Sequence, residues 1–164
     1  MQIARNESVL LPTDGFVKIG VICHNGLNLE APPLPADRRR HVHGFGPFAK
    51  LRMPRLPSEP GLYLWDEDGE VVYVGHARMP LKVRLGSEGD STISNYNTFA
   101  PEPRRSNGGQ QTNRRINALA NQSLRARHSL AILHRTMVAG RSGQEEVLWM
   151  RRFGLPKWNR RDER

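Results

Sequence analysis

The part of the chain that most constrains its fold is residues 61–75, with the sequence GLYLWDEDGEVVYVG. An aromatic, apolar run and a β-branched run flank an acidic turn that ends in Asp68 and Gly69. An Asp-Gly pair between two strand-forming runs is the strongest short-range signal for a β-hairpin. We therefore predict two antiparallel strands joined by a tight turn over these residues.

Two tyrosines should lie on neighbouring strands of this hairpin. Because side chains alternate along a strand, the two leucines of the first run should face one side while Tyr63 and Trp65 face the other. Tyr73 belongs to the second run. Each tyrosine is separated by one residue from a glycine, Gly61 or Gly75, which would leave the backbone open to a ligand. On the hairpin alone, aromatic packing and a functional site are equally good interpretations.

The positive charge of the chain is concentrated in one stretch. The formal net charge is +9 over 164 residues. Residues 103–144, 42 in number, contain no Asp or Glu and eight arginines, which match eight of the nine excess charges: Arg104, Arg105, Arg114, Arg115, Arg125, Arg127, Arg135 and Arg141. Such a stretch favours a polyanion-binding surface over a merely solvated face, and arginine suits bidentate contacts with phosphate or guanine. Nucleic acid is therefore the expected partner.

Cysteine content and hydropathy point to an intracellular protein. Cys23 is the single cysteine, so it cannot form a disulfide within the chain, and we expect it to be a small buried apolar residue. No apolar run approaches the roughly 18 residues of a membrane helix, and the initial MQIARNESVL lacks the apolar core of a signal peptide. These features predict a cytoplasmic protein without membrane partners.

The first sixty residues are predicted to be an N-terminal elaboration packed on the core rather than a separate domain. They contain a candidate strand at residues 16–22 and prolines that hold the chain extended before the hairpin. After the hairpin, Pro80 and the following helix formers predict a short helix that carries Arg84. Residues 87–111 lack periodicity, so we expect a long loop there.

A basic helix should follow this loop. Thr112 can cap it, and apolar residues at helical spacing predict its buried face: Ile116, Leu119, Ala120 and Leu124. Residues 129–135 then alternate as a third strand. The expected fold class is therefore mixed α+β, with a small three-stranded antiparallel sheet flanked by helices.

The last helix should begin soon after residue 140. Ser142 and Glu145 have the Ser-x-x-Glu spacing of a capping box, which gives Glu145 a structural role at the start of the helix. Glu146 then remains available to a metal ion. It lies seven residues before Phe153, which places both on the helix face that packs toward the sheet.

Taken together, these features resemble the GIY-YIG nucleases. The two triplets of that family are matched by residues 61–63, GLY, and residues 73–75, YVG, with nine residues between the triplets. The helix arginine, the later glutamate and the closing Pro-x-x-Asn of the family are matched in order by Arg84, Glu146 and Asn159. The resemblance implies a nuclease core over residues 61–164. It also implies an inserted basic DNA-recognition loop and helix at about residues 87–127.

The family chemistry implied by this resemblance is metal-dependent hydrolysis of a phosphodiester bond. Glu146 would hold one divalent cation, Mg²⁺ or alternatively Mn²⁺, with Glu145 as the other candidate ligand. Arg84 would neutralise a non-bridging phosphate oxygen. Tyr63 would be the general base or would orient the attacking water. A phenol with a pKa of about 10 acts as a base near neutral pH only where neighbouring charges favour the phenolate.

Other residues would support this chemistry. Tyr73 would position the phosphate or the water, and Asn159 would brace the site. His76 is a further catalytic candidate, although it and Lys82 can equally serve as contacts for backbone phosphate. The expected DNA contacts are Lys82, Arg104, Arg105, Asn113, Arg114, Arg115 and Asn117.

Three functions remain open from the sequence. The first is a sequence-specific endonuclease of restriction type that cuts duplex DNA as a homodimer, because one active site cuts one strand at a time. The second is a structure-directed or repair nuclease with little base specificity, and the third is an inert nucleic-acid-binding module. The basic segment at residues 104–127 favours the first function over the second, and intact Tyr63, Arg84 and Glu146 argue against the third. RNA stays open as an alternative substrate.

Overall fold

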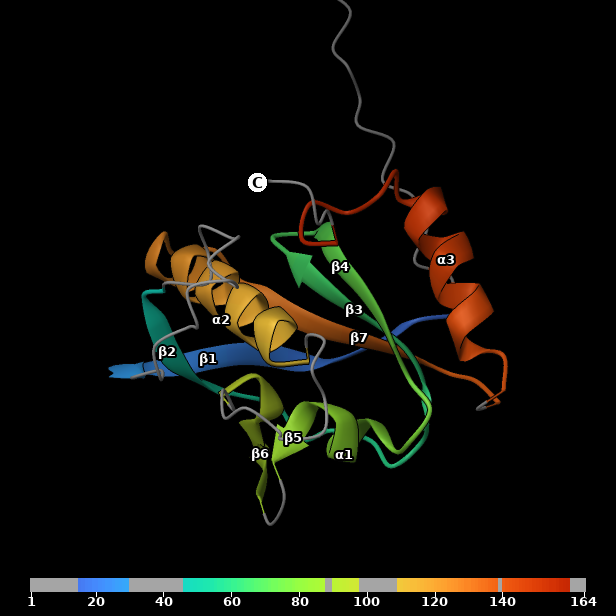
Figure 1. Ribbon diagram of the computed structural model, residues 1–164, viewed down its shortest axis with the longest axis horizontal. Helices are drawn as coiled ribbons and strands as arrows, with labels where there is room; N and C mark the ends of the chain where they lie inside the picture. Colours follow the sequence, from blue (N-terminus) through green and yellow to red (C-terminus); the bar gives the residue numbers. More distant parts are fainter. Residues whose placement is uncertain (1–14, 30–45, 88–89, 98–108, 139, 160–164) are drawn as a thin grey trace, which may run out of the picture.

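The computed structural model describes residues 15–29, 46–87, 90–97, 109–138 and 140–159, and it has a mixed α+β fold (Figure 1). Its strands form a seven-stranded sheet in the order β4-β3-β7-β1-β2-β6-β5. The strands are β1 (Val17–Leu29), β2 (Phe48–Arg52), β3 (Gly61–Glu67), β4 (Glu70–Ala77), β5 (Gly86–Ser87), β6 (Asp90–Ser94) and β7 (Leu130–Thr136). The helices are α1 (Leu81–Leu85), α2 (Gly109–Arg125), α3 (Ser142–Arg152) and the 3-10 helix η3 (Asn95–Asn97). The predicted fold class, mixed α+β, is confirmed.

The three strands predicted from the sequence lie next to one another. β3 pairs antiparallel with β4 on one side and with β7 on the other. The sheet continues beyond them, because β1 pairs with the second edge of β7 and β2 pairs with β1. The predicted three-stranded sheet is therefore too small. Two strands from the first sixty residues belong to the sheet itself, and the candidate strand at residues 16–22 lies in β1 apart from its first residue.

The hairpin closes with a two-residue turn at Asp68 and Gly69. Both residues have a positive φ, 52° and 92°, which is the combination that a type I′ turn requires. The backbone N–H of Asp68 donates to the carbonyl oxygen of Ser129 at 3.0 Å, which ties the turn to the start of β7. The Asp-Gly signal in the sequence therefore marks the turn correctly.

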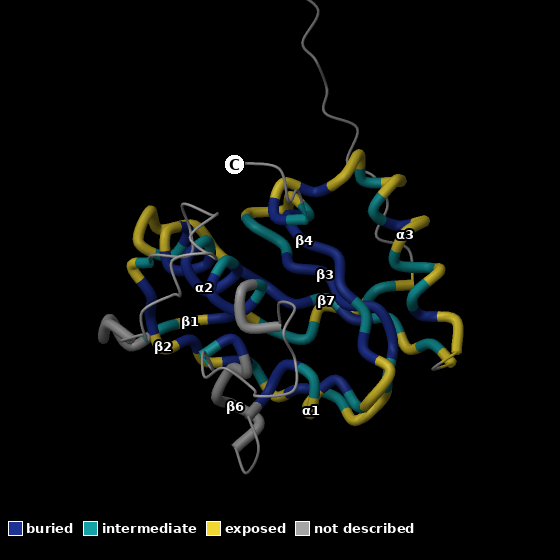
Figure 2. The backbone as a smooth tube through the Cα atoms, in the orientation of Figure 1, coloured by how far each residue is buried: buried dark blue, intermediate teal, exposed yellow. Residues whose placement is uncertain are grey.

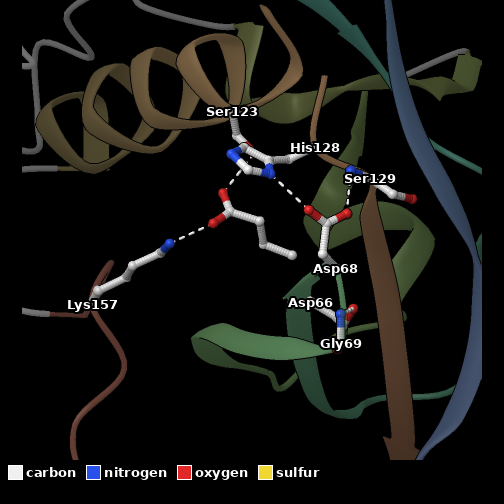
Figure 3. A network of polar contacts seen from close by, with 8 residues as sticks. Asp66, Asp68, Gly69, Ser123, His128, Ser129 and Lys157 are labelled. Atoms are coloured by element: carbon white, nitrogen blue, oxygen red, sulfur yellow. Dashed lines mark hydrogen bonds and ion pairs between the residues drawn. The ribbon is translucent and has the colours of Figure 1, made fainter. Parts of the chain in front are cut away.

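Polar side chains fasten this turn to two other parts of the chain (Figure 3). Glu67 accepts a hydrogen bond from Ser123 of α2 at 2.6 Å and another from Lys157 near the C-terminus. Burial raises the pKa of Glu67, but the hydrogen bonds from Lys157 and Ser123 outweigh burial, so the net shift is downward. Asp68 contacts Nδ1 of His128 at 2.6 Å. The hairpin, α2 and the C-terminal segment are thereby held together.

Alternation along β3 separates two apolar layers, as the hairpin pattern predicts. The two leucines of β3 pack with Val74 and with Trp149 of α3 on one face of the sheet. Tyr63 and Trp65 lie on the opposite face, in the larger core that includes residues of α1, η3 and α2. In Figure 2 most of the tube along β3 and β4 is dark blue, the colour of buried residues. We call the two sides of the sheet the α3 face and the α2 face.

Helix α2 carries the predicted apolar stripe but begins earlier than predicted. Its first residue is Gly109, so Thr112 lies inside the helix and the predicted cap at this residue is wrong. Two amides on α2 bond the backbone of β2 and of Pro47, the residue before it. Asn117 accepts from the Ala49 N–H at 3.0 Å and donates to the Ala49 carbonyl at 2.9 Å, and Asn121 donates to Pro47 at 2.9 Å. These contacts satisfy backbone groups of β2 that would otherwise need a neighbouring strand.

Part of the segment predicted as a long loop has regular structure. β5 and β6 form a short antiparallel pair, and β6 joins the sheet where Ile93 pairs with Arg52 of β2. η3 follows β6 directly. The prediction of a loop is therefore wrong for residue 87, which lies in β5, for residues 90–97 and for residues 109–111, which lie in α2, whereas residues 88–89 and 98–108 lie outside the described part.

The last helix lacks the predicted capping box. Arg141 is the residue that caps α3, and no side chain makes a capping hydrogen bond there. Arg141 already has helical backbone angles, φ −106° and ψ −13°, so Ser142 falls within the helix instead of capping it. After α3, Gly154 takes a positive φ of 68°, which glycine adopts without strain at the end of a helix.

Cys23 is exposed, so the prediction of a buried cysteine is wrong. Ile22 takes the core position on the α2 face, and alternation along β1 then turns Cys23 to the other side. Within the described ranges, no helix combines the length and the apolar character needed to cross a membrane.

Candidate active site

All three tyrosines of the chain meet on the α2 face. Tyr63 lies directly opposite Gly75 in the register of β3 and β4. The ring centroids of Tyr63 and Tyr73 are 6.2 Å apart, and the hydroxyl oxygens of Tyr63 and Tyr96 are 3.2 Å apart. We call these three residues the tyrosine cluster.

Close packing explains Gly61 and Gly75 of the hairpin. A Cβ atom at Gly75 would lie 2.3 Å from Cζ and 2.4 Å from the hydroxyl oxygen of Tyr63, so only glycine leaves room for this ring. At Gly61, where φ is +152°, a Cβ atom would lie 2.0 Å from the carbonyl oxygen of Arg135 in β7. The sequence suggested that these glycines leave the backbone open to a ligand. Protein atoms fill the space at both positions instead.

Arg84 supplies the positive charge beside the tyrosine cluster. It lies on α1, which buried Leu81 and Leu85 hold against the α2 face. Electrostatic interaction with Tyr63, and then with Tyr96, raises the pKa of the Arg84 guanidinium, while burial lowers it by less. Arg84 therefore carries a permanent charge next to the phenol groups.

The phenols of the cluster are neutral at physiological pH. Burial raises the pKa of Tyr63 well above its ordinary value, Tyr96 raises it further, and the charge of Arg84 opposes this shift. Burial is also the main cause that raises the pKa of Tyr73 and of Tyr96. In this structure Tyr63 is therefore a hydrogen-bonding group rather than a base, which fits the water-orienting role better than the general-base role.

Glu146 and His76 form a close pair at the end of β4. Oε2 of Glu146 lies 2.5 Å from Nδ1 of His76, and both side chains are partly exposed, at 20% and 28%. The charge of Glu146 also raises the pKa of Tyr63 and of Arg84. Of the two glutamates at the start of α3, Glu146 is thus the one whose contacts join it to the candidate site.

The site spans both faces of an edge strand. His76 lies opposite Leu62 in the register, which puts it on the α3 face, whereas Tyr63 and Tyr73 lie on the α2 face. β4 is the last strand of the sheet at this edge, it leads into α1, and α3 packs against it (Figure 1). The tyrosine cluster and the glutamate therefore approach each other around the end of β4.

Asn159 binds the outer edge of β4. Its Oδ1 accepts from the Val74 N–H at 2.8 Å, and its Nδ2 donates to the Val74 carbonyl at 2.8 Å. The N–H of Trp158 donates to the Val72 carbonyl at 2.8 Å. The C-terminal segment thus covers the free edge of the strand that carries Tyr73 and His76.

Three of the expected DNA contacts on α2 are buried within the protein. Asn117 is fully buried and its amide is bonded to Ala49 of β2, which leaves it no base to read. Asn113 is also buried, and Arg114 is buried with its guanidinium 5.8 Å from the centre of the Phe48 ring. The expectation that these three side chains face a DNA groove is therefore wrong in this structure. A polar side chain on a helix has the same sequence signal whether it faces solvent or a strand edge.

The other expected contacts differ in position. Lys82 is exposed on α1, and Arg115 is partly buried, donating from Nη1 to the carbonyl oxygen of Trp158. Arg104 and Arg105 lie outside the described residues.

Tyr96 is the site residue that sequence reasoning missed. It lies in a polar stretch without alternation, where no local signal predicts a buried aromatic side chain. One available clue was that Tyr96 is the third and last tyrosine of a chain whose other two lie in the hairpin.

No family model, curated protein or solved structure matches this chain. Among the described residues, no group of three or more His, Cys, Asp or Glu side chains could hold a metal ion. The features that bear on function are therefore the tyrosine cluster, Arg84 and the pair of His76 with Glu146.

Proposed function

We propose that this protein is a metal-dependent endodeoxyribonuclease of the GIY-YIG type. One observation carries the proposal: the tyrosine cluster, the cation of Arg84 and the carboxylate of Glu146 converge at one end of β4 although they come from five separate elements. Phosphodiester hydrolysis needs a positioned water, positive charge at the phosphoryl oxygens and a cation ligand. These three side-chain types supply those parts.

The donor chemistry at Glu146 fits Mg²⁺, with Mn²⁺ as the alternative cation. Mg²⁺ is commonly held by one or two carboxylates together with substrate phosphate oxygens and water, so one protein carboxylate is a sufficient anchor. A cation bound there would stabilise the charge that develops on the phosphoryl oxygens. His76 contacts Oε2 of Glu146, which orients the carboxylate and leaves Oε1 as an oxygen that could bind the cation.

The side chains of this protein divide the remaining work. Arg84 binds a non-bridging phosphate oxygen through its permanent charge. Tyr63, neutral in its buried position, orients the attacking water through its hydroxyl, and Tyr73 positions the phosphate. Asn159 holds β4 in place and thereby fixes the positions of Tyr73 and His76, which lie on this strand.

Duplex DNA is the proposed substrate and a homodimer the proposed cutting unit. The arginine-rich residues 103–144 support a polyanion as substrate, and two copies supply the two active sites that a double-strand break requires. Restriction-type, sequence-specific cleavage is the first candidate. Its base contacts would come from the segment that includes Arg104 and Arg105, with Lys82 and Arg115 as candidate phosphate contacts.

A specific observation favours a second candidate, a structure-directed nuclease with little base specificity. Asn113, Arg114 and Asn117, three side chains of types that read bases, are buried. Their burial reduces the number of groups on α2 that could distinguish one sequence from another.

Incubating the protein with a long duplex plasmid and Mg²⁺ tests the proposal and separates the candidates. Metal-dependent cleavage that stops on addition of EDTA supports a nuclease. Discrete fragments indicate a sequence-specific enzyme, whereas a smear or nicked circles indicate the structure-directed alternative. Salt-sensitive binding without cleavage in either Mg²⁺ or Mn²⁺ would overturn the nuclease proposal.

A further inference from the structure

The hydroxyl of Tyr96 is placed on Tyr63 by contacts that hold its backbone from two sides. Asn97, the next residue, accepts from the Leu51 N–H at 2.9 Å and donates to the Leu51 carbonyl at 2.9 Å, which fixes η3 to β2. Nδ2 of Asn117 lies 3.2 Å from the carbonyl oxygen of Tyr96 and 3.2 Å from Oδ1 of Asn97, which fixes η3 to α2. The position of Tyr96 is therefore set by two elements outside the catalytic hairpin.

The ring of Tyr96 is packed independently of its hydroxyl. It is only 1% exposed and meets the ring of Trp65 edge to face, with centroids 5.3 Å apart and planes at 83°. The apolar contacts explain why an aromatic ring is present. They do not require a hydroxyl, which costs free energy to bury unless it finds a partner. The hydroxyl of Tyr63, 3.2 Å away, is such a partner.

We propose that Tyr96 is a positioning residue for Tyr63, and that its hydroxyl fixes the direction in which the Tyr63 hydroxyl presents its oxygen to the attacking water. This inference rests on the proposed nuclease function. When the Tyr63 hydroxyl donates its hydrogen bond to the Tyr96 oxygen, the lone pairs of the Tyr63 oxygen are left to accept a hydrogen bond from the water. Tyr96 itself does not touch the reacting atoms. Its effect on the reaction passes through Tyr63.

The two hydroxyls of the pair are also coupled electrostatically. After burial, interaction with Tyr96 is the largest effect that raises the pKa of Tyr63, and their hydrogen bond adds to it. The same hydrogen bond lowers the pKa of Tyr96. The ionisation of each of these two tyrosines therefore depends on the other.

Kinetics of Tyr96→Phe test the inference, because this change removes the hydroxyl and keeps the ring. We expect kcat for duplex cleavage to fall about 10-fold to 100-fold with KM changed much less, as for loss of orientation at a reacting group. In a Tyr63→Phe background, Tyr96→Phe should have no further effect on kcat. Ser123→Ala is the matched control, since it deletes another buried hydroxyl that bonds Glu67 at the hairpin turn, and its kcat should equal that of the wild type.

A tyrosinate titration supplies a readout that needs no activity. Because the chain has only three tyrosines, absorbance at high pH reports on the tyrosine cluster alone. In Tyr96→Phe, the pKa of Tyr63 should be lower than in the wild type, because a group that raises it is gone.

An unchanged kcat in a cleaving Tyr96→Phe enzyme would overturn the inference and leave the nuclease function intact. The inference would also be overturned if Tyr96→Phe lowered kcat by the same factor in the wild type and in the Tyr63→Phe background, since Tyr96 would then act independently of Tyr63. If the wild type cleaves no DNA, the proposed function falls and the inference falls with it, whatever the titration shows.

Discussion

Replacing Gly75 with alanine should displace the Tyr63 ring and lower the free energy of unfolding. The added Cβ would lie 2.3 Å from Cζ and 2.4 Å from the hydroxyl oxygen of Tyr63, far inside van der Waals contact. Tyr63 is only 1% exposed and has packed neighbours, so its ring cannot move away freely. Overpacking of this kind costs about 1–3 kcal/mol, and we expect about 3 kcal/mol here because two atoms of a rigid ring are overlapped.

Urea denaturation of Gly75→Ala beside Gly140→Ala measures this cost. Gly140 has no atom within 4 Å of an added Cβ, so its variant controls for the lost backbone freedom of glycine. For a protein of this size, a loss of about 3 kcal/mol corresponds to a fall in Tm of roughly 6–12 °C. Cleavage should fall by about 100-fold as well, because the hydroxyl of Tyr63 is moved.

A double-mutant cycle shows whether the Tyr63 ring is the cause. Tyr63→Leu removes the atoms that the new Cβ would overlap, so Gly75→Ala should cost much less in that background than in the wild type. If Gly75→Ala is as stable as Gly140→Ala, to within about 0.5 kcal/mol, the close packing of Tyr63 on Gly75 is refuted.

Two further predictions concern residues outside the reacting groups. Asn117→Ala should lower the free energy of unfolding by about 2–4 kcal/mol, because it leaves buried backbone groups of β2 without partners, whereas Gln122→Ala on the exposed side of α2 should change it by less than about 0.5 kcal/mol. Similar urea midpoints for the two variants would contradict the bracing role of Asn117. The Ser129 N–H and then His128 lower the pKa of Asp68, so its stabilising effect is complete above the ordinary Asp pKa of about 4 and is lost as pH falls through the lowered folded-state pKa. Urea midpoints of wild type and Asp68→Asn should therefore converge in acid, and a difference that does not change with pH would contradict this.

Local signals predict the centre of this fold well. The turn at Asp68 and Gly69 is specified by neighbouring residues, and so are the alternating faces of β3 and the short helix that carries Arg84. The alternating pattern predicts a strand at residues 129–135, and β7 spans Leu130–Thr136. Each of these features is set by residues that lie close together in the sequence, through the spacing of apolar side chains or the positive φ of a turn.

Contacts between distant residues could not be predicted in the same way. Asn117 bonds Ala49, 68 positions earlier, so an amide that looks like a base-reading group on a basic helix is instead a brace for β2. β1 and β2 join the sheet because β7 offers a second edge, which no short pattern in the first sixty residues indicates. Tyr96, which lies in η3, is buried in the core that α2 and β3 share, although its own neighbours in sequence are polar.

The residues of the candidate site also fall into two groups, those indicated by local patterns and those that depend on packing between distant elements. The hairpin and its resemblance to a nuclease family suggested Tyr63, Tyr73, Arg84 and Glu146, and these side chains interact electrostatically in the structure. The 2.5 Å contact of His76 with Glu146 and the 3.2 Å contact of Tyr96 with Tyr63 depend on how α3 and η3 pack against the sheet. Spacing along the chain does not encode such packing.

The most direct test of the central claim is the Mg²⁺-dependent rate at which Glu146→Ala cuts a long duplex, measured beside Glu145→Ala. Both variants remove one carboxylate from the first turns of α3, but only Glu146 contacts His76 and shifts the pKa of Tyr63. We predict that Glu146→Ala still folds and binds the duplex but cleaves about 1,000-fold more slowly, while Glu145→Ala stays within about threefold of the wild type. Cleavage by the wild type in EDTA, or equal rates for the two variants, would contradict the account.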